Sequence, residues 1–173
     1  MTITECLNMI LHRDFSYAQA IGLLSNIEYE SAFNENALGD KNSNGEFTSY
    51  GLCQWHGTRW ERLKQYAGTI TTVPAQTQID FVKWEMEKYY PKTWIIFNSI
   101  ENNKEGAGKF AYYFCYNYEV PANRKTVSEK RRKRAEELYE MYYDDTKDTE
   151  TIINEILFHI GQIEGLIEKW KKQ

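Results

Sequence analysis

Apolar residues recur at helical spacing along most of this chain, and the pattern is interrupted once, at about residues 33–57. Glycine and proline, which break helices, make up only 10 and 3 of the 173 residues. The predicted helices cover residues 2–11, 16–31, 58–67, 74–90, 92–101, 105–117 and 126–143. We therefore predict a mainly α domain whose helices flank one irregular segment.

Individual residues mark where these elements begin and end. Ser16 is typical of a helix N-cap, and Pro91 is expected to end the helix before it. Within the irregular segment, the pair Asn44-Gly45 is typical of a tight turn between two strands. The sequence thus predicts a small β-hairpin with residues 47–50 on its returning strand.

Composition excludes several classes of protein. The net charge of −4 argues against binding nucleic acid as the main activity. No apolar run approaches the roughly 18 residues of a membrane span, and the N-terminal segment lacks the features of a secretory signal peptide. The three cysteines and three histidines are scattered, so we expect no disulfide framework, no metal site and no cofactor.

Charge is segregated towards the end of the chain. Residues 124–134 contain seven basic side chains and one acidic one, whereas residues 136–150 contain seven acidic and one basic. Arg132 and Glu136 lie four residues apart and can pair along one helix. This pattern is typical of a solvated helix face, and the alternative is a basic patch that binds an anionic polymer.

Residues 149–173 predict an amphipathic helix. Apolar residues recur seven apart in two sets: Ile153, Ile160 and Ile167, and Ile156, Ile163 and Trp170. Isoleucine at both heptad positions favours an assembly of three or more helices, but further apolar residues widen the stripe, which also suits packing within one chain. We predict a domain over residues 1–145 and a C-terminal helix over 146–173 that serves packing or association.

Glu30 is the first candidate for chemistry, because it lies where a helix is expected to end. The negative end of the helix dipole disfavours an ionised carboxylate at that position. Neighbouring aromatic residues can add desolvation in the same direction; these are Tyr29, Phe33, Tyr50 and Trp55. A carboxylic acid kept protonated is what a general acid needs in order to protonate a glycosidic oxygen.

Two motifs flank the predicted hairpin. They read Glu30-Ser31-x-Phe33-Asn34-x-Asn36-Ala37 and Ser49-Tyr50-Gly51-Leu52-Cys53-Gln54-Trp55. Together they resemble the phage tail lysozyme family, which belongs with goose-type lysozymes and soluble lytic transglycosylases. In those relatives a Glu-Ser pair at a helix end precedes a hairpin and a Gly-Leu-Met-Gln motif, which here reads Gly-Leu-Cys-Gln. The resemblance extends to residues 81–85 and 114–121 and covers about 15–140.

This resemblance implies a lysozyme-like helical domain with the hairpin beside a catalytic cleft. It further implies cleavage of the β-1,4 bond between N-acetylmuramic acid and N-acetylglucosamine in peptidoglycan glycan strands. Glu30 matches the family's catalytic acid. Hydrolysis and formation of an anhydro-sugar both remain open as the outcome.

The second catalytic group has several candidates. Asp40 lies at the entry to the predicted hairpin and is our first choice. Glu46 lies in the same hairpin, and Glu119 can approach from a later helix. A pair of carboxyl groups is the usual equipment of a glycosidase. The resemblance to lytic transglycosylases leaves another alternative, in which the acetamido group of the substrate takes this role.

Sugar binding is expected to use aromatic faces and amide groups along a groove. The candidates are Ser31, Tyr50, Gln54, Trp55, Tyr118 and Glu119. By match to an Ala-Tyr-Asn segment of the relatives, Tyr116-Asn117 is an alternative. The other tryptophans, Trp60, Trp84 and Trp94, are predicted to lie in the core.

The resemblance also implies a location. We expect a protein made in the host cytoplasm, carried in the phage tail of the virion, and acting on the bacterial cell wall. Its partners would be peptidoglycan strands and either other tail proteins or further copies bound through residues 149–173. The alternatives are an endolysin for host lysis and a catalytically inactive protein that binds glycan or builds the tail.

Overall fold

The computed structural model describes residues 1–68, 72–143, 159–164, 167, 170 and 171. The chain divides into two compact units, residues 1–141 and 142–173. Most of the helix predicted over 149–173 lies outside the described residues, and the described residues of that segment are helical. Within the described part of the chain, no helix is long and apolar enough to cross a membrane.

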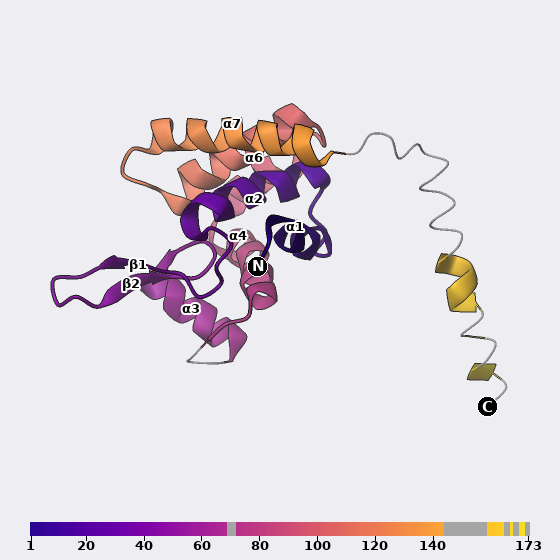
Figure 1. The fold of residues 1–173 in the computed structure, drawn as a ribbon, viewed down its shortest axis with the longest axis horizontal. Coiled ribbons are helices and arrows are strands. Elements are labelled where there is room, and N and C mark those ends of the chain that lie inside the picture. The colour runs from indigo at the N-terminus through magenta and orange to yellow at the C-terminus, as the bar shows by residue number, and fades with distance from the viewer. Residues whose placement is uncertain (69–71, 144–158, 165–166, 168–169, 172–173) are drawn as a thin grey trace. The chain divides into compact units, whose positions relative to one another are not determined.

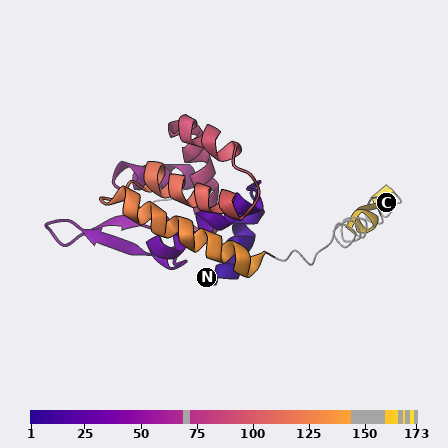
Figure 2. The ribbon, with the colours of Figure 1, turned by 90° about the horizontal axis from the view of Figure 1, so that it is seen from above.

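The first unit is mainly helical, as predicted, with a small antiparallel sheet (Figure 1). Its helices are α1 (Ile3–Leu11), α2 (Tyr17–Ser31), α3 (Thr58–Ala67), α4 (Ala75–Tyr89), α5 (Pro91–Asn98), α6 (Lys104–Phe114), the π-helix η1 (Cys115–Glu119) and α7 (Arg124–Tyr142). Its strands are β1 (Leu38–Lys41), β2 (Phe47–Tyr50) and β3 (Trp55–His56). Figure 2 shows the β1–β2 hairpin projecting from one end of the helical body.

Helix α2 is the centre of the core. Its N-cap Ser16 and residue Gln19 form a capping box, which confirms the predicted start of the helix. Gly22 allows α6 to approach closely, since a Cβ there would lie 2.7 Å from the ring of Phe110. The buried Asn26 donates hydrogen bonds to the carbonyl of Gly22 (2.9 Å) and, across the interface, to that of Ala111 (3.2 Å). These contacts hold α2 firmly, and with it the residues at its end.

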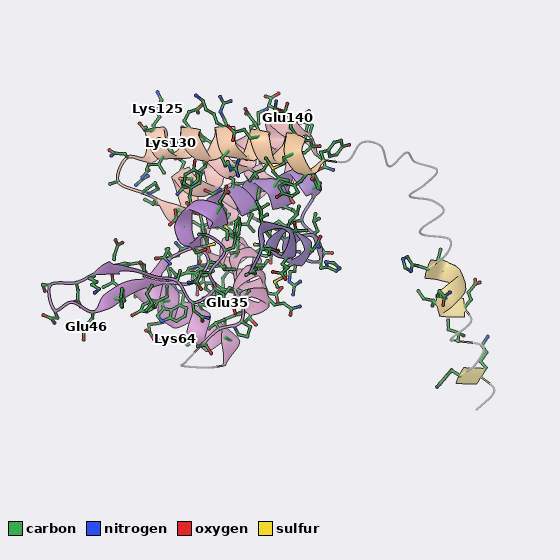
Figure 3. All side chains as sticks on the ribbon, in the orientation of Figure 1. Glu35, Glu46, Lys64, Lys125, Lys130 and Glu140 are labelled. Atoms are coloured by element: carbon green, nitrogen blue, oxygen red, sulfur yellow. The ribbon has the colours of Figure 1, made fainter. Side chains whose placement is uncertain are left out.

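The hairpin forms as the turn residues predict. Gly45 has a φ of 81°, and the side chain of Asn42 accepts hydrogen bonds from the backbone of Asn44 (2.9 Å) and Glu46 (3.0 Å). Strands β1, β2 and β3 are neighbours in that order, and β2 pairs with both others. Glu46 lies at the tip of the hairpin (Figure 3).

Some expectations need correction. Helix α4 ends before Pro91, as expected. Pro91 is also the first residue of α5, where its missing N–H costs nothing. The helix expected over residues 105–117 changes to a π-helix at Cys115. Trp60, Trp84 and Trp94 are predicted to lie in the core, but all three are only half-buried.

The three cysteines are buried and free.

The basic residues of α7 divide into two groups: some are exposed to solvent, and others form ion pairs with acidic residues. Lys125 and Lys130 lie on the outer side of the helix (Figure 3). Arg132 pairs with Glu136 at 3.6 Å, as its spacing predicts. In contrast, Arg134 forms an ion pair with Glu28 of α2 (2.7 Å), so part of the run fixes α7 against the core.

Candidate active site

Glu30 lies in the last turn of α2, where the chain leaves the helical body for the sheet. Helix α2 ends because Ala32 adopts the left-handed conformation, with a φ of 48°. The side chain of Glu30 faces a cavity of about 400 Å³ between the sheet and the end of η1. Its walls are Glu30, Gly39, Asp40, Ser49, Gln54, His56, Glu119, Val120 and Pro121. The cavity therefore gathers four of the predicted site residues: Glu30, Asp40, Gln54 and Glu119.

Arg131 holds the carboxyl group of Glu30. Its Nη2 lies 2.7 Å from Oε1 of Glu30, and the arginine side chain is 8% exposed while that of Glu30 is 23% exposed. The guanidinium also lies over the ring of Tyr29, 4.0 Å from its centroid. Such a contact fixes the orientation of the Glu30 carboxyl group.

The aromatic surroundings expected for Glu30 are absent from this cavity. None of Tyr29, Phe33, Tyr50 and Trp55 is among the residues that form its walls. The groups that act on Glu30 within the cavity are charged or ionisable: Arg131 pairs with it, and Glu119 lines the same cavity.

Glu119 is a buried carboxyl group beside Glu30. Both of its carboxyl oxygens are inaccessible to solvent, and neither accepts a hydrogen bond of ordinary geometry from the described residues. Burial, followed by the negative charge of Glu30, raises the pKa of Glu119 well above its usual value. Arg131 opposes this rise in pKa but does not cancel it. Glu119 therefore keeps its proton to a higher pH than an exposed glutamate does.

Asp40 enters the cavity from β1. It is exposed and has a φ of 27°, a conformation uncommon for a residue other than glycine. Asp40 and Glu30 line the same cavity. Asp40, the first choice for the second carboxylate, thus lies near the predicted acid. Glu46, the alternative in the hairpin, lies at the exposed tip and does not line this cavity.

Gln54 braces the sheet at the edge of the cavity. Its amide nitrogen donates to the carbonyls of Gly51 (3.0 Å) and Ala37 (3.3 Å), and its Oε1 accepts from Ser49 (2.9 Å). A Cβ at Gly39 would lie 2.0 Å from that oxygen, so the glycine is needed for the close approach. Both polar atoms of the Gln54 side chain therefore have protein partners already. The predicted contact with sugar would add to these hydrogen bonds.

Trp55 and Tyr118 were predicted to bind substrate, and their positions contradict this. Trp55 is 0% exposed and Tyr118 is 1% exposed, so both belong to the core. The indole N–H of Trp55 donates to the hydroxyl of Tyr118 (3.0 Å), which in turn donates to the carboxylate of Glu85 (2.6 Å). Arg59 completes this buried cluster, because its Nη2 lies 2.7 Å from Glu85. Trp55 and Tyr118 therefore do not line the cavity. The buried cluster holds them in the core beside it.

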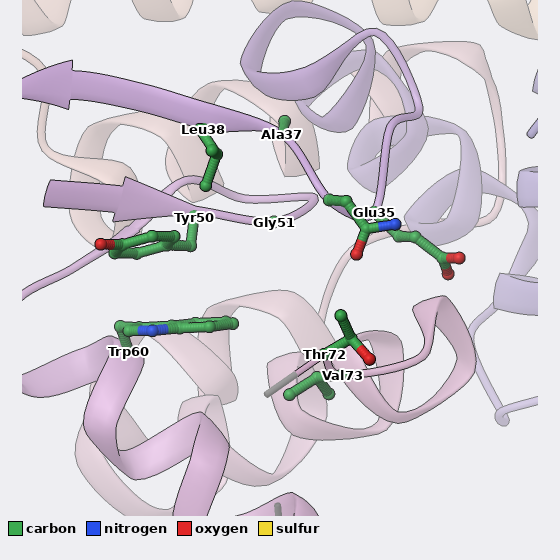
Figure 4. Close-up of a pocket in the computed structure, with 9 residues that line it drawn as sticks. Glu35, Ala37, Leu38, Tyr50, Gly51, Trp60, Thr72 and Val73 are labelled. Carbon is green, nitrogen blue, oxygen red and sulfur yellow. The ribbon is translucent and has the colours of Figure 1, made fainter. Parts of the chain in front are cut away.

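Tyr50 and Ser31 lie outside the cavity that Glu30 lines. Tyr50 stacks on Trp60, with ring centroids 4.8 Å apart, and the two form part of the wall of a second cavity of about 450 Å³ (Figure 4). Ser31 donates to the carbonyl of Ile27 (3.1 Å) and is used locally within α2. If either residue binds sugar, it does so away from the carboxyl groups.

Two residues of the site were not singled out by the sequence. Arg131 is one of seven basic residues in a run, and it reaches Glu30 across a separation of 101 residues. His56 lines the cavity from β3. For His56 the only available signal was its position directly after the Gly-Leu-Cys-Gln-Trp motif.

A mainly α domain with a small sheet beside a cavity lined by carboxyl groups is a lysozyme-like protein. The chain belongs to the phage tail lysozyme family, whose model matches residues 2–142. A search among curated proteins finds no match to this chain. Membership of the family makes it a phage-associated protein that acts on the peptidoglycan of the bacterial cell wall.

Proposed function

We propose that this protein is a muramidase or lytic transglycosylase that cleaves the β-1,4 bond between N-acetylmuramic acid and N-acetylglucosamine. The observation that carries this proposal is the cavity that both Glu30, from the end of α2, and Asp40, from strand β1, line. Family membership supports peptidoglycan as the substrate. Glu30 is the general acid of the proposed reaction.

In the proposed mechanism, Glu30 donates a proton to the bridging oxygen, and the bond to the departing sugar breaks. The positive charge that develops on the remaining sugar ring has the character of an oxocarbenium ion. Asp40, which lines the same cavity, stabilises this charge. Water or the 6-hydroxyl of the sugar then adds to the ring carbon, and the Glu30 carboxylate takes up the proton that it releases, which restores the acid. The Arg131 guanidinium stabilises the Glu30 carboxylate left behind.

We further propose that the protein is carried in the phage tail, where it opens the wall locally during infection. The family to which the chain belongs supports this location. An endolysin would use the same chemistry at the end of infection. Detection of the chain in purified virions by mass spectrometry would support the tail location, and its absence there together with release during lysis would support the endolysin.

Digestion of purified peptidoglycan tests the activity. We expect soluble muropeptides, and their masses identify both the bond and the outcome: hydrolysis leaves a reducing N-acetylmuramic acid, and transglycosylation leaves its anhydro form, lighter by one water. A reducing N-acetylglucosamine end would contradict the proposed bond. Binding to cell walls without release of fragments would favour the inactive glycan-binding alternative.

The Asp40→Asn variant tests the second carboxyl group. The amide keeps the size of the side chain but removes the negative charge, so we expect kcat to fall about 10-fold or more if this charge stabilises the transition state. The side chain is exposed, so the variant should keep its melting temperature. Glu46→Gln, at the hairpin tip, is the control and should retain activity. Unchanged kcat in Asp40→Asn would favour assistance by the substrate's acetamido group.

A further inference from the structure

Glu119 occupies an unusual position at the end of the π-helix η1. The next residue, Val120, has a φ of 59° and is followed by Pro121, so the chain turns sharply after Glu119. This turn places Val120 and Pro121 beside Glu119 in the wall of the cavity, and the two Glu119 carboxyl oxygens are covered from solvent. A carboxyl group in such a place, with both oxygens covered and no donor, is costly to ionise.

The backbone around Glu119 is held by the buried cluster. Arg59 donates to the carbonyl of Tyr118 (3.0 Å), and its guanidinium lies 4.0 Å from the centroid of the Tyr118 ring. The hydroxyl of Tyr118 is fixed by Glu85. The residue that precedes Glu119 is thus fixed at both its main chain and its side chain, which limits how far Glu119 can move.

Charged and titratable groups surround Glu119 from each packed element. Glu30 approaches from α2 and Arg131 from α7, and Cys115 lies at the start of η1. Asp40 of β1 and His56 of β3 line the same cavity. Cys53 is a further buried neighbour, and burial raises the pKa of its thiol well above the usual value, which keeps the thiol neutral. The charged groups that act on the Glu119 carboxyl are thus Glu30 and Arg131.

We propose that Glu119 is a positioning residue for the acid, in that it shares one proton with Glu30 and keeps it beside the carboxyl group that faces the cavity. This inference rests on the proposed function of Glu30. With one proton on the pair, one negative charge faces the positive charge of Arg131, and the buried group as a whole is neutral. Loss of that proton leaves two carboxylates against a single arginine, which is unfavourable away from water.

The direction of the Glu119 pKa agrees with this arrangement. Burial and the charge of Glu30 raise it, and the charge of Arg131 lowers it without cancelling the rise. Two carboxyl groups that interact this closely titrate as a pair, with the second proton released at a much higher pH than the first. The raised pKa of Glu119 thus agrees with a proton that stays on the pair where a lone, exposed glutamate has lost its own.

The pH dependence of activity in Glu119→Gln tests the proposal. Glutamine keeps the shape of the side chain but can neither hold the exchangeable proton nor repel the Glu30 carboxylate. The active enzyme needs a proton on Glu30, so we expect the alkaline limb of the kcat/KM profile to move to lower pH by about one unit or more. Glu87→Gln, an exposed substitution on α4, is the control and should reproduce the wild-type profile.

A second measurement needs no activity. Above about pH 4.3 the unfolded chain has lost the proton that native Glu119 keeps, so the native state binds more protons and its stability falls as the pH rises. We expect the melting temperature of the wild type to fall between about pH 5 and 8 more steeply than that of Glu119→Gln. Equal slopes would overturn the buried, protonated state of Glu119.

These results separate the two proposals. If the wild type digests no peptidoglycan, the proposed function fails, and the melting curves still decide whether Glu119 holds a proton. If the wild type is active and Glu30→Gln is not, but Glu119→Gln keeps the wild-type alkaline limb, the shared proton is refuted while the proposed function stands. A uniform loss of activity at every pH would likewise assign Glu119 a merely structural role.

Discussion

Glu30→Gln should lower kcat on purified peptidoglycan by at least 100-fold, the largest effect on activity that we expect. A positioned general acid contributes about 10²–10⁴-fold, and glutamine cannot donate a proton to the glycosidic oxygen. The amide has the same shape and can still accept a hydrogen bond from Arg131. The variant should therefore remain folded and bind cell walls, and the initial rate of muropeptide release is the appropriate measurement.

The control for this variant lies two residues earlier on the same helix. Glu28 also pairs with an arginine of α7, since Arg134 Nε lies 2.7 Å from its carboxylate. It does not line the cavity that Glu30 faces. Glu28→Gln thus removes an equivalent ion pair and should leave kcat close to that of the wild type. Full activity in Glu30→Gln, or an equal loss in both variants, would refute Glu30 as the acid.

Local sequence signals predicted the elements of this fold well because their causes are local. The capping box of Ser16 and Gln19 needs only neighbouring backbone, and the turn at Asn44-Gly45 is fixed within five residues of the hairpin. The end of α2 near Ser31 was also predicted, which placed Glu30 at a helix terminus. The position of the first candidate residue was therefore accessible before its surroundings were.

The surroundings of the site depend on contacts between distant segments, and these the sequence did not reveal. Arg131 looks like its basic neighbours in a charged run, and only the packing of α7 on α2 turns it towards Glu30. Trp55 belongs to a motif that the family resemblance makes prominent, but its indole lies in the core, where it donates to the hydroxyl of Tyr118. A motif identifies a segment and does not tell which of its side chains face the cavity.

The π-helix is a further feature that helical periodicity missed. A regular helix through residues 105–117 would continue the stripe of Phe110 and Phe114, whereas the wider turn of η1 changes the direction of the residues that follow. The result is that Tyr118 is buried in the core while Glu119 approaches the carboxyl group of Glu30. Such turns are frequent at functional sites because they re-aim side chains.

Glu85→Ala should cause the largest loss of stability, about 3–5 kcal/mol. The carboxylate of Glu85 is 0% exposed and accepts hydrogen bonds from Arg59 (2.7 Å) and from the hydroxyl of Tyr118 (2.6 Å). Burial raises the pKa of Tyr118 well above its usual value, so the hydroxyl stays protonated and needs an acceptor. Removing Glu85 leaves that hydroxyl and a largely buried guanidinium without their partner.

Asp80→Ala on the same helix is the matched control for this prediction. Asp80 also pairs with an arginine, Arg13, at 2.7 Å, but its side chain is 39% exposed, so water replaces the lost contact. An exposed pair of this kind contributes at most about 1 kcal/mol. Urea unfolding of both variants measures the difference in the free energy of unfolding. If Glu85→Ala costs no more than Asp80→Ala, the buried cluster is not what holds η1, and another contact must fix Glu119 beside Glu30.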